Sequence, residues 1–291
     1  MGKVVYPYIP NSVPEIKKQM LEALGINSVD DIYAEIPAHL RFKGTMDLPE
    51  PLLSEYALRR HVEGILAQNK TCSEYLNFLG GGIWQHYVPE VCDTINLRDE
   101  FLTAYVGDAY ADHGKFQAMF EYASMVGDLL GFDVVSTPTF DWGMAAGYCL
   151  RMAARITGRN RVLVIKTISP DRHLCIQNLI KPGLKLEFVD YNSDTGLFNL
   201  DDLKTKISAE TAAVYFENPS YLGFIETQAA EIADLAHDNG ALCVVGVDPS
   251  SLGVLAPPSA YGADIACGEL QPLGIQMAAG GGLAGFIASR D

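Results

Sequence analysis

Three loops carry the side chains best suited to chemistry, and each is expected at the C-terminal end of a predicted strand. The first loop, STPTFDWGMAAG at 136–147, places small and hydroxyl side chains just before a helix. Backbone N–H groups at such a helix start can hold a phosphate, so Asp141, Trp142 and Gly143 are candidate cofactor-binding residues. A plain helix cap by Thr139 or Asp141 explains the same pattern equally well.

The second loop, VVGVDPSSLG at 244–253, ends a predicted strand in Asp248 and continues with a proline. A carboxylate held at such a point can pair with the ring nitrogen of a pyridine cofactor, as the pyridinium partner of pyridoxal phosphate does. An aspartate before a turn also shapes or caps that turn, and the spacing alone favours this structural explanation.

The third loop follows a short apolar run in GADIACGELQPLGIQMAAGGGLAGF at 262–286. An enzyme that holds pyridoxal phosphate as a Schiff base needs a lysine shortly after the strand that bears the aspartate. The last lysine of the chain is Lys206, and Glu269 and Gln271 stand where an amine would be needed. This chain therefore cannot form that Schiff base at the usual place, and Gln271 marks the vestigial position.

Histidines and glycine clusters give weaker signals. His86 and His113 lie in polar loops, which makes them better candidates for a general base than His237 on a predicted helix. The glycine triplets at 80–82 and 280–282 lack the spacing of a dinucleotide-binding motif. The six cysteines show no short Cys/His spacing, so no metal site is expected.

The elements that must position these loops alternate along the chain from about residue 113. Helices are predicted at 113–131, 142–158, 171–180, 199–207 and 227–240, and strands at 161–167, 184–191, 212–218, 241–248, 263–268 and 282–289. Because the strands are continuously apolar, we expect a mostly parallel sheet covered on both faces, in a three-layer α/β domain. Ligands of such sheets bind at the C-terminal ends of the strands.

The first hundred residues show helical patterns and connecting loops without strand alternation. Capping boxes are predicted at Ser12 with Glu15 and at Ser28 with Asp31, and an amphipathic helix is predicted at 54–69. We therefore expect a helical N-terminal extension at 1–100 and a large α/β domain at 101–291, and a smaller C-terminal domain is expected to be missing.

The composition and charge of the chain argue against several classes of protein. The chain has 291 residues, 48% of them hydrophobic, and a formal net charge of −15, which argues against nucleic-acid binding. Most cysteines lie in apolar runs, as expected for reduced, buried thiols in the cytoplasm. The sequence has neither a signal-peptide pattern nor an apolar run of membrane-spanning length, so we expect a soluble, intracellular protein.

Several ordered motifs give the chain a family resemblance. They are YIPNSVPEIKKQMLEALGINSVDDIYAEIP, NFLGGGIWQHYVPEV, EFLTAY, NPSYLGFIE, GALCVVGVDPSSLGVLAPPSAYGADI and GELQPLGIQ. Together they resemble subunit 1 of the two-subunit glycine dehydrogenase (decarboxylating), the P-protein of the glycine cleavage system. The resemblance runs from residue 6 to the last residues of the chain.

The resemblance implies a fold-type-I pyridoxal-phosphate architecture in a cytoplasmic hetero-oligomer. Subunit 2 would supply the cofactor lysine, and this chain would be an oxidoreductase subunit that is inactive alone. The implied reaction decarboxylates glycine on pyridoxal phosphate and passes the aminomethyl group to the lipoyl arm of the H-protein. The aromatic loop LGGGIWQHYVP would fit a subunit interface.

Some segments depart from the family pattern, mainly at strand ends. After EFLTAY the family typically continues TPYQPEISQG, which lines the shared active-site region, whereas this chain reads VGDAYADHGK. Tyr105, Asp112 and His113 are therefore candidate catalytic residues of the pocket wall. The family's MYDG is here TFDWG, in which Trp142 is inserted beside the phosphate loop.

These departures leave two alternatives to a working glycine decarboxylase subunit. The chain could belong to a related pyridoxal enzyme that acts on another small amino acid or amine. It could also be a non-catalytic scaffold or regulatory partner, which the missing lysine permits.

Overall fold

The computed structural model describes residues 5–6, 8–78, 80, 83–99 and 113–290. The chain divides into two compact units, Met1–Lys70 and Thr71–Asp291. Residues 71–99 therefore belong with the α/β unit, whereas the sequence predicted a helical extension that continues to about residue 100. The physical reason is contact, because the backbone of Trp84 is hydrogen-bonded to the side chain of Gln271.

The first unit consists of short helices and connecting chain, and none of its described residues is buried. Its helices are η1 (Pro10–Ser12), α1 (Pro14–Leu24), η2 (Val29–Tyr33) and α2 (Glu55–Leu66). The predicted capping box at Ser28 and Asp31 is present. The one at Ser12 is wrong, because Val13 occupies the N-cap of α1 and the Ser12 hydroxyl instead accepts a hydrogen bond from the Tyr6 N–H at 2.9 Å.

The second unit is built on a seven-stranded, mostly parallel sheet, which confirms the predicted fold class. The strands are β1 (Val134–Val135), β2 (Arg161–Ile165), β3 (Lys185–Val189), β4 (Thr211–Glu217), β5 (Leu242–Val247), β6 (Ile265–Glu269) and β7 (Gly285–Ser289). Their spatial order is β1-β7-β6-β5-β4-β2-β3. The five strands from β6 to β3 are parallel, and β7 and β1 are antiparallel additions at one edge.

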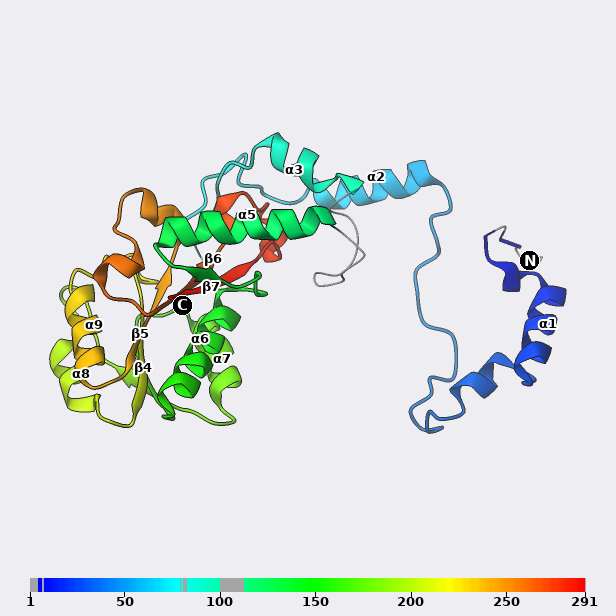
Figure 1. Ribbon diagram of the computed structural model, residues 1–291. Coiled ribbons are helices and arrows are strands. Elements are labelled where there is room, and N and C mark those ends of the chain that lie inside the picture. Colours follow the sequence, from blue (N-terminus) through cyan, green and yellow to red (C-terminus); the bar gives the residue numbers. More distant parts are fainter. Residues whose placement is uncertain (1–4, 7, 79, 81–82, 100–112, 291) are drawn as a thin grey trace. The chain divides into compact units, whose positions relative to one another are not determined.

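Helices cover both faces of this sheet, as expected from the alternating pattern. They are α3 (Glu90–Asn96), α5 (His113–Leu130), α6 (Trp142–Thr157), α7 (Pro170–Ile180), α8 (Leu200–Lys206) and α9 (Ala229–Asp238), with short helical turns η3 (Pro249–Gly253), η4 (Pro258–Tyr261), η5 (Gln271–Leu273) and η6 (Ala278–Gly280). Figure 1 shows α6 and α7 on one face and α8 and α9 on the other. No helix in the described part of the chain is long and apolar enough to cross a bilayer.

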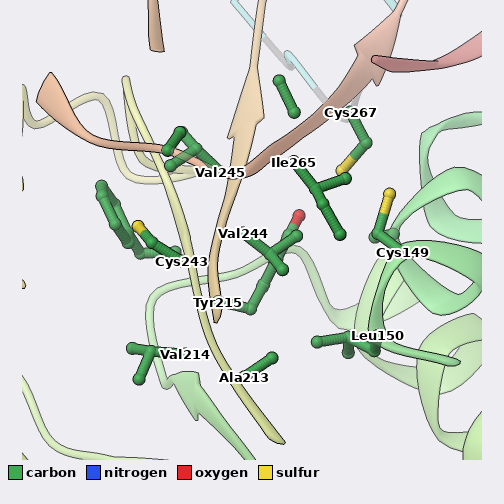
Figure 2. Packing of buried hydrophobic residues seen from close by; sticks show 14 of the residues in the cluster. Cys149, Leu150, Ala213, Val214, Tyr215, Cys243, Val244, Val245, Ile265 and Cys267 are labelled. Carbon is green, nitrogen blue, oxygen red and sulfur yellow. The ribbon is translucent and has the colours of Figure 1, made fainter. Parts of the chain in front are cut away.

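The core lies between the central strands and α6. Every residue of β4 is buried, and Cys149 and Leu150 of α6 are fully buried against the sheet. Figure 2 shows the thiols of Cys149 and Cys267 directed toward one another between α6 and β6. Burial of such apolar surface contributes about 25 cal/mol per Å², so this layer stabilises the fold.

The topology gathers four chain segments at the C-terminal ends of the parallel strands. Strands β4, β5 and β6 end there at Glu217, Val247 and Glu269, because parallel strands share a direction. Helix α6 begins beside them, since Thr139 pairs with Gly285 at the start of β7. The three loops singled out in the sequence therefore meet at these strand ends.

Candidate active-site remnant at the strand ends

The N-terminus of α6 is occupied by carboxylates of the protein itself. Asp141 is the N-cap, and its Oδ1 accepts a hydrogen bond from the Met144 N–H at 2.7 Å. Glu269 Oε2 accepts a hydrogen bond from the Trp142 N–H at 3.2 Å. The positive end of the helix dipole favours negative charge, and both side chains supply it. Asp141 thus serves as the helix cap, one of the two roles that the sequence allowed.

Glu269 connects the end of β6 to two neighbouring segments. Its side chain is buried, and its Oε1 accepts hydrogen bonds from the Ala284 N–H at 2.5 Å and the Gln271 N–H at 3.3 Å. Burial raises the pKa of the Glu269 carboxyl above its ordinary value, and the backbone N–H bonds only partly oppose this shift.

Trp142 is a fixed part of the wall. Only 4% of it is exposed, and its indole Nε1 donates to the Tyr215 hydroxyl at 3.2 Å. That hydroxyl in turn donates to Glu217 Oε1 at 3.1 Å, and burial holds the pKa of Tyr215 well above its ordinary value. A Cβ at Gly246 would lie 2.9 Å from the indole, so only glycine on β5 leaves room for it.

Arg172 and Glu217 form a buried ion pair behind this wall. Arg172 Nε and Nη2 each donate to one Glu217 carboxylate oxygen at 2.7 Å. The guanidinium carbon lies 4.1 Å from the centre of the Trp142 ring. Burial alone disfavours the charged guanidinium, but the Glu217 carboxylate outweighs it and raises the pKa of Arg172 above its ordinary value.

Sequence reasoning missed this pair. Glu217 ends a fully buried strand and Arg172 lies in the first turn of α7, so each stands where a strand-end site collects residues. A carboxylate at the end of a buried strand needs a cationic partner, so Glu217 in the sequence could have predicted such a pair.

Gln271 holds the segment that carries Trp84. Its side chain is fully buried, and its Oε1 accepts from the Trp84 N–H at 2.9 Å. Its Nε2 donates to the carbonyls of Trp84 at 3.0 Å and Ile275 at 3.1 Å. The Trp84 ring consequently stacks on Trp142, with ring centroids 6.4 Å apart and an interplanar angle of 16°.

The histidines differ in their surroundings. His86 Nδ1 lies 3.1 Å from the Trp84 carbonyl oxygen and 3.4 Å from Gln271 Nε2. The Nε2 of His86 is buried and has no hydrogen-bond partner among the described residues. His237 Nε2 lies 2.8 Å from Asp264 Oδ2 at the surface of α9. Of these two histidines, His86 contacts the candidate site.

Asp248 follows β5 and shapes the turn after it. Its Oδ1 accepts hydrogen bonds from the Ser250 N–H at 2.9 Å and from the Ser250 hydroxyl at 2.7 Å. It therefore caps η3, as the structural explanation of its position predicted.

Two adjacent cavities open at these strand ends, of about 230 Å³ and about 210 Å³. Both are lined by Ile83, Trp84, Trp142 and Arg172. The first adds Asp141, Gly143, Ser169, Asp171, Cys175, Glu269, Gly280 and Leu283, and the second adds Gly80, Pro219, Ser220, Tyr221 and Asp248. No lysine is among these lining residues, and each volume is below the roughly 300 Å³ at which ligand pockets usually begin.

The structure therefore brings together four of the predicted cofactor-binding residues, namely Asp141, Trp142, Gly143 and Asp248, around the two cavities. Gln271 lies just behind them as a tether. Tyr105 and Asp112 lie outside the described residues, as does the side chain of His113, the first residue of α5. Over the described ranges no three His, Cys, Asp or Glu side chains are grouped as a metal would need.

Comparisons with known proteins agree with this geometry. The family model described as "Glycine cleavage system P-protein" matches residues 7–291. The chain is 40% identical over 294 residues to the "Probable glycine dehydrogenase (decarboxylating) subunit 1" of Staphylothermus marinus. This alignment covers 98% of this chain and 62% of that protein. The protein of the same name from Aeropyrum pernix is 40% identical over 295 residues, covering 98% of this chain and 63% of that one.

Solved structures extend the comparison. An inhibitor-bound crystal structure of glycine decarboxylase (P-protein) of the glycine cleavage system matches with a TM-score of 0.83 and 35% identity, over 99% of this chain and 63% of that chain. A sphingosine-1-phosphate lyase from Burkholderia pseudomallei shares the fold alone, with a TM-score of 0.59 and 14% identity over 88% of this chain and 63% of that chain. The chain spans a little under two thirds of the length of the relatives that it matches. It belongs to the glycine cleavage system P-protein family.

Proposed function

We propose that this chain serves as a lysine-less subunit of a glycine dehydrogenase (decarboxylating), in the position that its relatives' names call subunit 1. The assembled enzyme would decarboxylate glycine and pass the aminomethyl group to the lipoyl arm of an H-protein. The family match and the names of the relatives support this proposal. All six cysteines are free, which agrees with a reducing compartment such as the cytoplasm.

The residues of this chain do not fit pyridoxal phosphate, the cofactor that the family implies. A phosphate would need free N–H groups at the start of α6, but Glu269 and Asp141 already accept hydrogen bonds from the Trp142 and Met144 N–H groups. These two carboxylates at the start of α6 are the observation that carries the proposal, because they would also repel a phosphate.

Two further observations support the same assignment. The Trp142 indole fills the space next to Gly246, close to the end of β5 where a pyridine ring would need to approach Asp248. No lysine lines either cavity. We therefore assign the cofactor and its lysine to a partner subunit, and no chemical step to this chain alone.

This chain would then contribute a rigid wall to an assembled site. The Arg172–Glu217 pair, Trp142 and Trp84 are interlocked by hydrogen bonds and stacking, so they present a fixed shape. Such preorganisation positions a reacting group without reorganisation when the substrate binds.

Absorbance spectroscopy tests the proposal. The purified chain is incubated with pyridoxal phosphate and reduced with borohydride, alone and after addition of the partner subunit, and the lysines that carry the adduct are mapped. We expect a stoichiometric adduct only in the mixture, located on the partner. A stoichiometric adduct at a defined lysine of this chain alone would refute the proposal.

One variant and one activity assay sharpen the test. Asp248→Ala should leave the cofactor absorbance of the assembled enzyme unchanged, because Asp248 is engaged with Ser250. Release of CO₂ from labelled glycine by the same assembly, compared with other small amino acids and amines, separates glycine decarboxylation from a related pyridoxal reaction. An assembly without any such turnover would support a scaffold instead.

A further inference from the structure

A third cavity, of about 770 Å³, lies at the N-terminal ends of the parallel strands, opposite the strand-end site. Its lining comes from the last turns of α6 and α7, the loop between α6 and β2, the segment that leads from α7 into the first residue of β3, and the turn before β4. Arg155 in this lining is 13 residues from Trp142 along α6, which places the two sites roughly 20 Å apart. The cavity is therefore separate from the site described above.

The lining of this cavity is positively charged, whereas the chain as a whole is negatively charged. The chain has a formal net charge of −15, yet Arg151, Arg155, Arg159 and Lys185 line this cavity with Glu210 as the only acidic residue. Low-dielectric walls around charges of one sign focus the electric field and raise the local concentration of opposite charge. The cavity thus attracts anions on a protein that otherwise repels them.

Two of these cations are held in place without a counter-charge. Arg159 Nη1 donates to the carbonyls of Thr211 and Asn239, both at 2.8 Å, and Arg151 Nη1 donates to the carbonyl of Leu179 at 3.3 Å. Carbonyls orient a guanidinium but leave its charge unneutralised.

The other two cations have free head groups. Neither the Arg155 guanidinium nor the Lys185 ammonium has a hydrogen bond or ion pair within the described ranges. The neighbouring Arg161 behaves differently, since its Nε donates to Glu187 at 3.0 Å. Acidic residues were thus available in this region and do not neutralise the cavity.

Helix dipoles explain only part of this arrangement. Helices α6 and α7 both end here, and cations near a helix C-terminus are favourable. Arg159 and Lys185, however, lie on the loop after α6 and at the start of β3, outside either helix. Four cations around one concave space exceed what two helix ends require.

We propose that this cavity binds a small molecule with two or more adjacent phosphate groups, of about the size of a nucleoside diphosphate. Guanidinium groups match the geometry of phosphate oxygens and form charge-assisted bonds with them. The cavity volume of about 770 Å³ lies in the range of small-ligand pockets and can hold a molecule of this size. The inference is independent of the proposed catalytic role, because it uses none of the residues of the strand-end site.

Isothermal titration calorimetry on the full chain tests the proposal, with inorganic pyrophosphate and ADP as probes. We expect a Kd below ~1 mM that rises with salt, as screening of charge requires. The double variant Arg155→Gln/Lys185→Gln should raise the Kd at least tenfold. Lys204→Gln, in the last turn of α8 and outside this cavity, is the control and should leave the Kd unchanged.

Other ligand sources give distinct results. Citrate that binds as tightly as pyrophosphate, and equally depends on Arg155 and Lys185, would overturn phosphate specificity in favour of a polycarboxylate. Binding of polyglutamate without binding of pyrophosphate would replace the small-molecule site with a face for an acidic protein. Absence of pyrophosphate and ADP binding up to ~1 mM, or equal weakening by Lys204→Gln, would refute the site. None of these results bears on the borohydride test, so the two proposals fail separately.

Discussion

The two ends of helix α6 differ in how their charged side chains are neutralised. At the N-terminal end the buried charged groups are partnered: Asp141 and Glu269 accept backbone N–H bonds, and Arg172 is paired in two hydrogen bonds with Glu217. At the C-terminal end, arginines stand in a cavity with carbonyl partners or none. The charges at the first end are neutralised within the protein, whereas the cations at the second end can bind an anion from solution.

This difference has an energetic consequence. A buried ion pair is costly to break because one uncompensated charge remains in a low-dielectric place. Exposed cations with no partner contribute little to stability and repel one another slightly. Substitutions at the two ends should therefore affect the free energy of unfolding very differently.

Removal of Arg172 should have the largest effect. Arg172→Met leaves the fully buried Glu217 carboxylate without its cation, and we expect the free energy of unfolding to fall by about 3–5 kcal/mol. Urea denaturation measures the change. Lys166→Met is the control, because the Lys166–Asp190 pair is about half exposed and solvent screens it, so its loss should lower the free energy of unfolding far less. Equal losses from the two variants would contradict the account.

Loss of the Gln271 tether should come next. Gln271→Met keeps the volume but leaves the N–H and C=O of Trp84 unpaired, at a cost of about 1–3 kcal/mol. The chain has only two tryptophans, and they stack on each other, so intrinsic fluorescence reports the opening directly. Gln276→Met, at an exposed position, should leave the emission unchanged. An unchanged spectrum for Gln271→Met would show that other contacts hold Trp84.

The pH dependence at Glu269 should be smaller and has a definite sign. Burial raises the pKa of Glu269 above its ordinary value of 4.5, so the native state keeps this proton to higher pH than the unfolded chain. Its contribution to stability is therefore present at low pH and is lost as the pH rises from about 4.5 through the folded-state pKa.

Urea titrations of wild type and Glu269→Gln between pH 4 and pH 7 would show this. The stability of the wild type should fall relative to the variant as the pH rises through that window. Asp202 provides the opposite case, since hydrogen bonds from the Asp190 N–H and Lys206 lower its pKa despite burial. For Asp202→Asn, measured in a second series that extends below pH 4, the wild type should lose its relative advantage as the pH falls from about 3.8 through the lower folded-state pKa. A pH-independent difference for both variants would refute this assignment.

The smallest effect on stability should come from the basic cavity. Arg155→Gln/Lys185→Gln removes two unpaired cations, and we expect a change within about 0.5 kcal/mol in either direction. Thermal denaturation of the double variant beside wild type measures it. A loss above about 2 kcal/mol would mean that these side chains serve stability and that the cavity is structural.

Much of the α/β unit could be predicted because its central strands are short, largely apolar and buried. The prediction of a strand at 161–167 agrees with β2 at Arg161–Ile165, and the same pattern located the other parallel strands. The two-residue β1 was missed because a strand of that length has no periodicity. The boundary near 100 was misplaced because contacts such as Trp84 to Gln271 join residues 187 apart in sequence.

The site was predictable in place but not in detail. Asp141, Trp142 and Asp248 follow from the rule that strand ends converge, and the lysine-free C-terminal part is visible in the sequence itself. The partners of these residues were not predictable. The Arg172–Glu217 pair depends on the fold bringing α7 to the end of β4, and the role of Gln271 depends on a distant loop.

None of the described residues of Met1–Lys70 is buried, and this should affect the steady-state amount of the protein in a cell. Leu53, Phe42 and Tyr8 are among its exposed apolar side chains, and α2 has only 12 residues, a length at which an isolated helix is marginal in water. Folding of this unit is linked by mass action to whatever covers those side chains. Quality control by proteases and chaperones acts on such exposed segments, so covering these side chains should raise the steady-state amount of this protein.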